Sequence, residues 1–207
     1  MLLPYHSHVL LAILWCISDK ENEIRIVAEK ANRDLITVVQ ETTCSFELKS
    51  LLDALEAELL EKEDVSTKIA ALSWIDMLMG KRKRDMNSFS ESMLPVLLRT
   101  LTDQSDDVVL LDLQVLSRIS LSQSNVGDKK DSPQGEAQFQ LVLNAILEMF
   151  SKDKQLLETR GSLIIRKLCV LLNARSVYIR LADTLASYEL PDYDDKKETS
   201  HASLKFV

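Results

Sequence analysis

The chain has few of the residues that interrupt helices or that fill the cores of β-sheets. Among its 207 residues there are four glycines and four prolines, and aromatic residues make up 5%. Glycine and proline interrupt helices, and a β-sandwich core usually needs more aromatic side chains. Leucine, alanine, glutamate and lysine are abundant instead, and these side chains lose little conformational freedom in a helix. The composition therefore predicts a helical protein.

The chain also lacks an excess of positive charge. Its formal net charge is −7 at pH 7, with 46% hydrophobic and 28% charged residues. A negative chain repels phosphate groups on average, so we expect no nucleic-acid ligand and no direct grip on an anionic membrane. The balance of hydrophobic and charged residues is typical of a globular protein.

The apolar run near the N-terminus is short. Val9–Ile17 has nine residues, whereas a helix that spans a bilayer needs about 20. No lysine or arginine precedes this run, although a signal peptide would require one. The sequence therefore predicts neither a signal peptide nor a transmembrane segment, and we interpret the run as a packed helix.

Motifs that carry catalysis or hold cofactors are missing as well. The four glycines are too scattered for a phosphate-binding loop. His6 and His8 have no evident third metal ligand, and His201 lies close to the C-terminus. No base is suggested beside Cys44 or Cys169, and the three cysteines form no CxxC pair, so we expect buried thiols of a reducing compartment. We therefore predict a protein that is not an enzyme and that has no catalytic residues, metal or cofactor.

An internal repeat is present. Three segments share one layout: an apolar helix, a short acidic turn at 18–23, 61–64 or 102–107, and a second amphipathic helix. Asp19 and Asp103 occupy the same place in the first and third copies and lie 84 residues apart, which is two periods of 42. HEAT and armadillo repeats have periods of about 40–47 residues. A fourth copy follows at 139–172, and a fifth begins at Val177 and fades near Ser187.

This repeat predicts an all-α fold, a HEAT/armadillo-like α-solenoid of antiparallel helix pairs. One pair cannot bury its own apolar face, so stacked neighbours build the core together. The second helix of the first copy carries a continuous apolar stripe made of Ile24, Val27, Ala28, Ala31, Leu35, Val38 and Val39. In the second copy we expect Trp74 at a repeat interface, beside Ala71 and Leu78.

Two segments depart from the repeat pattern. Residues 122–136 are polar and contain Gly127, Pro133 and Gly135, which predicts a solvated loop inserted between repeats. Residues 189–207 contain a proline and a run of aspartates and lysines, which predicts a disordered tail. We thus expect HEAT-type repeats over 1–121, the loop over 122–136, further helical repeats over 137–188 and the tail over 189–207.

The basic cluster formed by Lys81, Arg82, Lys83 and Arg84 has competing interpretations. It places positive charge at the end of the helix that contains Trp74, where the helix dipole favours cations. If it is exposed, it is instead a nuclear signal or an anion-binding and lipid-binding patch.

Basic residues also recur near the start of the second helices, at Arg25, Lys68 and Arg160. We expect them to pair with the acidic turns as a structural ladder. Gly161 costs a helix up to about 1 kcal/mol relative to alanine, so something should compensate for it. Either the preceding helix packs closely there, or Arg160 and Gly161, with Arg166 and Lys167, open a surface for a partner.

Several strings resemble the vacuole-morphology HEAT-repeat scaffold family. The most specific string runs from Leu156 to Cys169, and shorter ones lie at 23–28, 71–75, 78–82 and 107–111. The resemblance covers roughly Val9–Tyr188, and the chain departs from the family's pattern after about Tyr188. The family's C-terminal partner-binding domain would begin near Gln138.

This resemblance implies a non-catalytic scaffold that binds a Fab/PIKfyve-type lipid kinase and a Sac-type phosphoinositide phosphatase. Those enzymes make and turn over phosphatidylinositol 3,5-bisphosphate. The resemblance also implies a peripheral place on the cytoplasmic face of vacuole or late-endosome membranes, with indirect membrane contact, and self-association of the full-length protein. The alternative hypothesis is a HEAT-repeat transport adaptor that recognises protein cargo.

Overall fold

The computed structural model describes residues 6–42, 47–61, 63–86, 88–122 and 133–187. These residues form helices and no strands, so the predicted all-α class is confirmed. The helices are α1 (His6–Ile17), α2 (Asn22–Glu41), α3 (Leu48–Glu61), α4 (Val65–Lys81), α5 (Lys83–Met86), α6 (Ser90–Thr100), α7 (Asp106–Ser122), α8 (Pro133–Lys152), α9 (Lys154–Leu171) and α10 (Ala174–Ser187).

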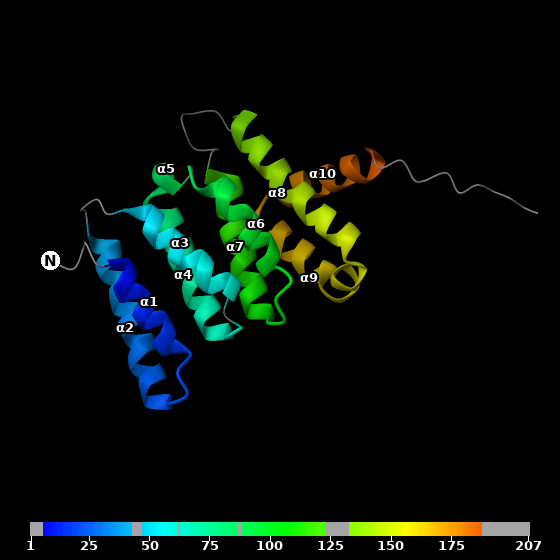
Figure 1. The fold of residues 1–207 in the computed structure, drawn as a ribbon. Helices are drawn as coiled ribbons and strands as arrows, with labels where there is room; N and C mark the ends of the chain where they lie inside the picture. Colours follow the sequence, from blue (N-terminus) through cyan, green and yellow to red (C-terminus); the bar gives the residue numbers. More distant parts are fainter. Residues whose placement is uncertain (1–5, 43–46, 62, 87, 123–132, 188–207) are drawn as a thin grey trace, which may run out of the picture.

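The helices stack as pairs in two layers (Figure 1). The first helices of the pairs, α1, α3, α6 and α8, contact one another in sequence, and the second helices, α2, α4, α7 and α9, do the same. α10 packs on α8 and α9, and α5 is a single turn in the connection between α4 and α6. The rod therefore runs from α1–α2 at its blue end to α10 at its orange end, as a HEAT-like solenoid should.

Helix starts follow the chemistry of the acidic turns. Asp64 caps α4, because its side chain accepts a hydrogen bond from the Thr67 backbone N–H at 2.8 Å. Asp153 caps α9 in the same way, through the Leu156 backbone N–H at 2.9 Å. Aspartate is favoured at this position, since it satisfies a backbone donor that has no partner within the helix.

The expected loop is partly helical. α8 begins at Pro133, so residues 133–136 belong to a helix although the sequence pattern placed them in the loop. Proline fits there, because the missing N–H has no partner in the first turn of a helix. Residues 123–132 and the expected tail at 189–207 lie outside the described residues, as does Cys44.

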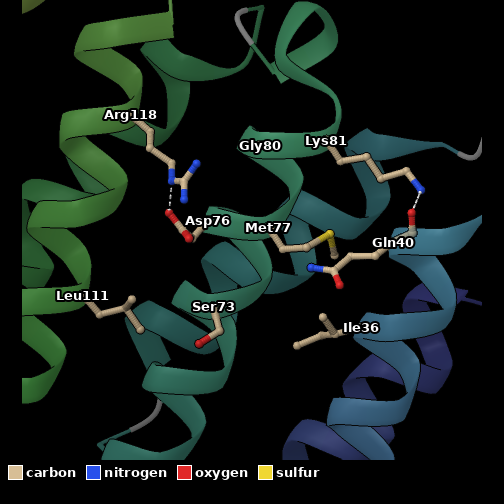
Figure 2. Close-up of a pocket in the computed structure, with 9 residues that line it drawn as sticks. All are labelled: Ile36, Gln40, Ser73, Asp76, Met77, Gly80, Lys81, Leu111 and Arg118. Carbon is tan, nitrogen blue, oxygen red and sulfur yellow. Dashed lines mark hydrogen bonds and ion pairs between the residues drawn. The ribbon is translucent and has the colours of Figure 1, made fainter.

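Polar contacts between neighbouring repeats reproduce the period of the sequence. The bonded residues are 42 or 43 positions apart in the pairs Trp15–Glu58, Asn32–Trp74, Val39–Lys81 and Asp76–Arg118. Figure 2 shows two of the residues involved, Asp76 and Arg118, meeting across α4 and α7. The period of 42 is therefore the step from one helix pair to the next.

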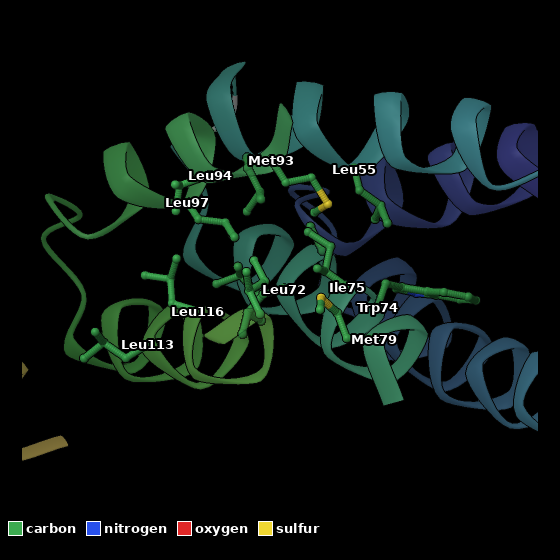
Figure 3. Close-up of a cluster of buried hydrophobic side chains, with 14 of the residues drawn as sticks. Leu55, Leu72, Trp74, Ile75, Met79, Met93, Leu94, Leu97, Leu113 and Leu116 are labelled. Atoms are coloured by element: carbon green, nitrogen blue, oxygen red, sulfur yellow. The ribbon is translucent and has the colours of Figure 1, made fainter. Parts of the chain in front are cut away.

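Trp74 lies where the repeat pattern places it. Its side chain is 1% exposed, and Ala71 and Leu78 beside it are fully buried. Its indole Nε1 donates a hydrogen bond to Asn32 Oδ1 on α2 at 2.7 Å. Figure 3 shows the surrounding core, where side chains of α3, α4, α6 and α7 meet between the layers.

The apolar stripe of α2 is only partly buried, in contrast to the expectation from the sequence. Ala28 and Val39 are buried, but Ile24 is 41% exposed, Val27 68% and Val38 56%. α3 and α4 cover one side of the first pair. The stripe is wider than that side, so part of it faces outward.

Asp112 on α7 is a carboxyl group without partners. The residue is fully buried, and neither of its carboxylate oxygens has a hydrogen-bond partner. Burial raises the pKa of Asp112 well above its usual value, because the charged form loses its hydration. The fold therefore favours the protonated form of this side chain.

Replacing Asp112 with asparagine should raise the free energy of unfolding at neutral pH by about 1–3 kcal/mol, because asparagine cannot ionise. A carboxyl group whose pKa is raised by folding contributes its full stability below the unfolded-state pKa, about 3.9, and loses it as the pH rises. The advantage of the variant should thus shrink to nothing as the pH falls to about 4. Urea unfolding of both proteins over a pH series measures this, and a difference independent of pH would contradict it.

Candidate functional site

The turn between α6 and α7 is held from two sides by neighbouring repeats. Lys68 Nζ on α4 lies 2.5 Å from Asp103 Oδ2, with the two side chains only 15% and 9% exposed. From the other side, Arg160 on α9 donates to the backbone carbonyls of Asp103 and Gln104. Its guanidinium also lies 3.2 Å from Asp106 Oδ1. We call Lys68, Asp103 and Arg160 the turn clamp.

The predicted ladder of basic residues and acidic turns is therefore present, with unequal rungs. Arg25 closes its own turn, where it donates to the carbonyls of Asp19 at 2.8 Å and Lys20 at 3.0 Å. Lys68 and Arg160 instead reach the turn of another repeat. Three consecutive repeats are thereby joined at Asp103.

The residues predicted to bind a partner divide into two groups. The Arg160 side chain is 18% exposed and is engaged within the protein by the turn clamp. Gly161 is buried, and a Cβ atom there would lie 2.8 Å from Leu157 Cδ1. The close neighbour of Gly161 is thus in its own helix, and the expected approach of the preceding helix is wrong. Arg166 is exposed and Lys167 half-buried, so these two remain candidates.

The basic cluster is used partly inside the protein. Lys81 Nζ donates to the carbonyls of Val39, Gln40 and Thr42 at the end of α2, as Figure 2 shows for Gln40. Arg82 Nε donates to Asp85 Oδ2 at 2.8 Å. The helix-end interpretation holds for Lys81, but the carbonyls that it satisfies are those of the neighbouring helix. The side chains of Lys83 and Arg84 lie outside the described residues.

A recess of about 430 Å³ lies on the layer of second helices, between α2, α4 and α7 (Figure 2). Its lining includes Ile36, Met77 and Leu111, with Gln40 and Arg118 at its rim. The Arg118 guanidinium pairs with Asp76 on the adjacent repeat, and Gln114 donates to Asp76 at 3.1 Å. These bonds join α4 and α7, so we assign them to packing between repeats.

Exposed apolar side chains gather at the far end of the rod. Val170 on α9 is 80% exposed, and Tyr178 and Leu185 on α10 are 76% and 63% exposed. Arg166 precedes Val170 by one turn, and Arg175 precedes Tyr178 by about one turn, both exposed. We call these five residues the α9–α10 face. An apolar patch with a basic rim is typical of a surface that binds protein.

Comparison with known proteins identifies the family. Residues 2–109 match the family described as "EF3 N-terminal HEAT repeat". Residues 154–203 match the family of the "Vacuolar protein 14 C-terminal" segment, which is described by its binding of a partner protein. The "Protein VAC14 homolog" of Arabidopsis thaliana is 37% identical over 192 residues, which is 93% of this chain and 24% of that protein. The chain belongs to the VAC14 family of HEAT-repeat proteins.

Two further VAC14 relatives support this assignment. The "Protein VAC14 homolog" of Schizosaccharomyces pombe is 30% identical over 152 residues, 72% of this chain and 17% of that protein. "Vacuole morphology and inheritance protein 14" of Saccharomyces cerevisiae is 25% identical over 191 residues, 90% of this chain and 20% of that protein. The chain thus spans a quarter or less of the length of these relatives. No solved structure matches the chain significantly.

The VAC14 match moves the boundary expected for the partner-binding segment. The family of the C-terminal binding segment, which we call the VAC14 C-terminal binding family, matches from residue 154, at the start of α9, and not from near Gln138. The match continues to residue 203, so the expected departure from the family after Tyr188 is wrong. Within the described residues, this VAC14 segment consists of α9 and α10 and includes the whole α9–α10 face.

The described part of this VAC14-family chain offers no site of another kind. Across those ranges, no group of three or more His, Cys, Asp or Glu residues could hold a metal ion. None of the described helices combines the length and the hydropathy that crossing a membrane requires. Cys16 and Cys169 are free and half-buried, where the sequence led us to expect full burial. The α9–α10 face was not found from the sequence, although apolar residues outside the α9 and α10 stripes were a signal for it.

Proposed function

We propose that this chain is a non-catalytic scaffold of the complex that makes and turns over phosphatidylinositol 3,5-bisphosphate. In this proposal, segment 154–203 binds a Sac-type phosphoinositide phosphatase, and the HEAT-type repeats hold that segment in place. The observation that carries the proposal is the match of residues 154–203 to the VAC14 C-terminal binding family, together with the exposed apolar surface on α9 and α10.

The geometry supports a rigid presentation of the α9–α10 face. α9 contacts α7 and α8, and Arg160 fixes its first half to the Asp103 turn. Arg160 is internal, whereas Arg166, two turns further along α9, is exposed. The internal half of α9 therefore anchors the helix, and the exposed half is available to a partner.

The proposal extends to the other partner and to the location implied by the family resemblance. A Fab/PIKfyve-type lipid kinase is the second enzyme that the scaffold brings together with the phosphatase, and the full-length protein self-associates. The name of the Saccharomyces cerevisiae relative refers to vacuole morphology, which supports a peripheral place on the cytoplasmic face of vacuole or late-endosome membranes. Membrane contact through these partners agrees with the net charge of −7.

Co-precipitation with a Sac-type phosphatase tests the proposal. The chain should recover the phosphatase, and Tyr178→Glu should lose most of that recovery, because a carboxylate would stand in the middle of the apolar α9–α10 face. Tyr178 is 76% exposed, so the substitution should leave the fold intact. Leu141→Glu on α8 is the matched control, since Leu141 is 43% exposed and lies outside the segment that matches the VAC14 C-terminal binding family.

The outcomes separate the hypotheses. Equal recovery by the chain, Tyr178→Glu and Leu141→Glu would show that another surface binds the phosphatase. Recovery of a transport GTPase in place of the lipid kinase and the phosphatase would favour the cargo adaptor instead.

A further inference from the structure

An apolar groove lies between α1 and α2 at the opposite end of the rod from the α9–α10 face. Its volume is about 570 Å³, and Glu23 is the charged residue in its lining. The apolar lining residues are Val9, Ala12, Ile13, Cys16, Ile24, Val27, Ala28 and Ala31. Val27 is 68% exposed and Ile24 41%. A large apolar surface of this kind is costly to leave in water.

The next repeat shows that this side of a second helix is a packing surface. α2 and α4 align at their N-caps, Glu21 and Asp64, each of which accepts the first backbone bond of its helix at 3.2 Å. Under that alignment Ile24, Val27 and Ala31 correspond to the residues at 67, 70 and 74. Those residues are Thr67, Ala70 and Trp74, with exposed fractions of 0%, 6% and 1%.

The contacts of those α4 residues are made to the repeat before them. Thr67 Oγ1 donates to the Leu14 carbonyl at 3.4 Å, and Trp74 Nε1 donates to Asn32 at 2.7 Å. The same side of α2 is open in this structure. A helix surface therefore fits the α1–α2 groove.

The charges beside the groove indicate which helix it accepts. Glu23, Val27, Lys30 and Asp34 recur at steps of four, three and four residues, so they lie along one side of α2. The three charged residues of this set are exposed, and none of them forms an ion pair with another described residue. Glu23 stands about as far before Val27 as Lys30 stands after it.

This pattern is complementary to itself when two copies of α2 run antiparallel. With Val27 opposite Val27 of the second copy, each Glu23 faces a Lys30, and each Ile24 faces an Ala31. A two-fold interface requires such reciprocity, because residue i contacts residue j and j contacts i. The apolar side chains of each α2 then cover the groove of the other copy.

We propose that a second copy of this chain packs on the α1–α2 groove, as a two-fold dimer centred on Val27. The α9–α10 face lies at the other end of the rod and stays open in this dimer. The dimer thus presents two such faces pointing away from its centre. The inference rests on the α1–α2 surface alone and does not depend on which partner binds segment 154–203.

The molar mass of the complete chain in solution tests the dimer, measured by light scattering after size exclusion over a concentration series. The chain should approach twice its mass of 23.5 kDa, and Val27→Glu should return it to a single chain, because two carboxylates would meet at the two-fold axis. Ile26→Glu is the matched control on the same helix. Ile26 is 56% exposed but is rotated about 100° away from Val27, so that variant should still dimerise.

A charge exchange tests the register separately. Glu23→Lys should weaken the dimer, since the new lysine faces Lys30 of the second copy, and the double variant Glu23→Lys/Lys30→Glu should restore it. A single-chain mass at every concentration would overturn the dimer and leave the groove to a helix of another protein. Dimers of undiminished strength in Val27→Glu, or no rescue by the charge exchange, would overturn the antiparallel arrangement. Helical circular dichroism equal to that of the parent shows that each variant is folded.

Discussion

Trp74→Ala should lower the free energy of unfolding by about 3–5 kcal/mol, as large-to-small changes of buried aromatic residues do. The side chain is 1% exposed, so truncation leaves a cavity between α2 and α4. It also removes the donor to Asn32, which is itself only 8% exposed, and a buried polar group without a partner adds to the loss. Urea unfolding followed by circular dichroism measures the change.

Two companion variants separate the contributions. Trp74→Phe keeps a ring in the core but removes the indole N–H, so it should cost about 1–3 kcal/mol. Tyr178→Ala removes an aromatic side chain that is 76% exposed, and should stay within about 0.5 kcal/mol of the parent. If Trp74→Ala unfolds at nearly the same urea concentration as Tyr178→Ala, Trp74 does not hold the repeat interface together.

Asp103→Ala should lower the free energy of unfolding by about 3–5 kcal/mol, the usual result of breaking one side of a buried ion pair. The Lys68 ammonium, 15% exposed, would lose its carboxylate 2.5 Å away and remain in a poorly hydrated place. The variant also loses the bond from the Ser105 backbone N–H to Asp103 Oδ1, which is 2.8 Å long.

Asp19→Ala is the matched control, because Asp19 makes the same local bond in the first repeat. Its Oδ1 accepts from the Glu21 backbone N–H at 2.8 Å, and it forms no ion pair with another described residue. That variant should lose only the turn bond, about 1 kcal/mol. The double variant Lys68→Met/Asp103→Ala should lose less than the sum of its single variants, because it leaves no unpaired cation. Strictly additive losses would show that Lys68 and Asp103 are not coupled.

These two positions show how function and stability are arranged along the rod. Trp74 joins the first and second repeats, and Asp103 joins the second, third and fourth. Arg160, which completes the turn clamp, lies in the segment that matches the VAC14 C-terminal binding family. The orientation of α9 therefore depends on contacts with repeats that lie well before it in the sequence.

The sequence by itself determined the all-α class, the repeat period and the places of the acidic turns. These features depend on residues close together in the chain, such as the aspartates at 64 and 153 that cap the helix beginning one residue later. Helical periodicity and capping act within a few residues, so they can be read without the fold. The pairing of basic residues with the turns was also predicted, because such pairing recurs once in most repeats.

Only the tertiary structure decided which partner each long side chain reaches and which side of a helix stays open. Arg160 binds a carbonyl 57 residues away, and Lys81 satisfies the end of α2, 42 residues away. Those targets depend on the angle at which one helix pair packs on the next, which no local pattern encodes. The same holds for Asp112, whose side chain is enclosed because α4, α6, α8 and α9 all pack on α7. Val27 shares the apolar stripe of Ala28 yet is exposed, because the packed repeat covers only one side of α2.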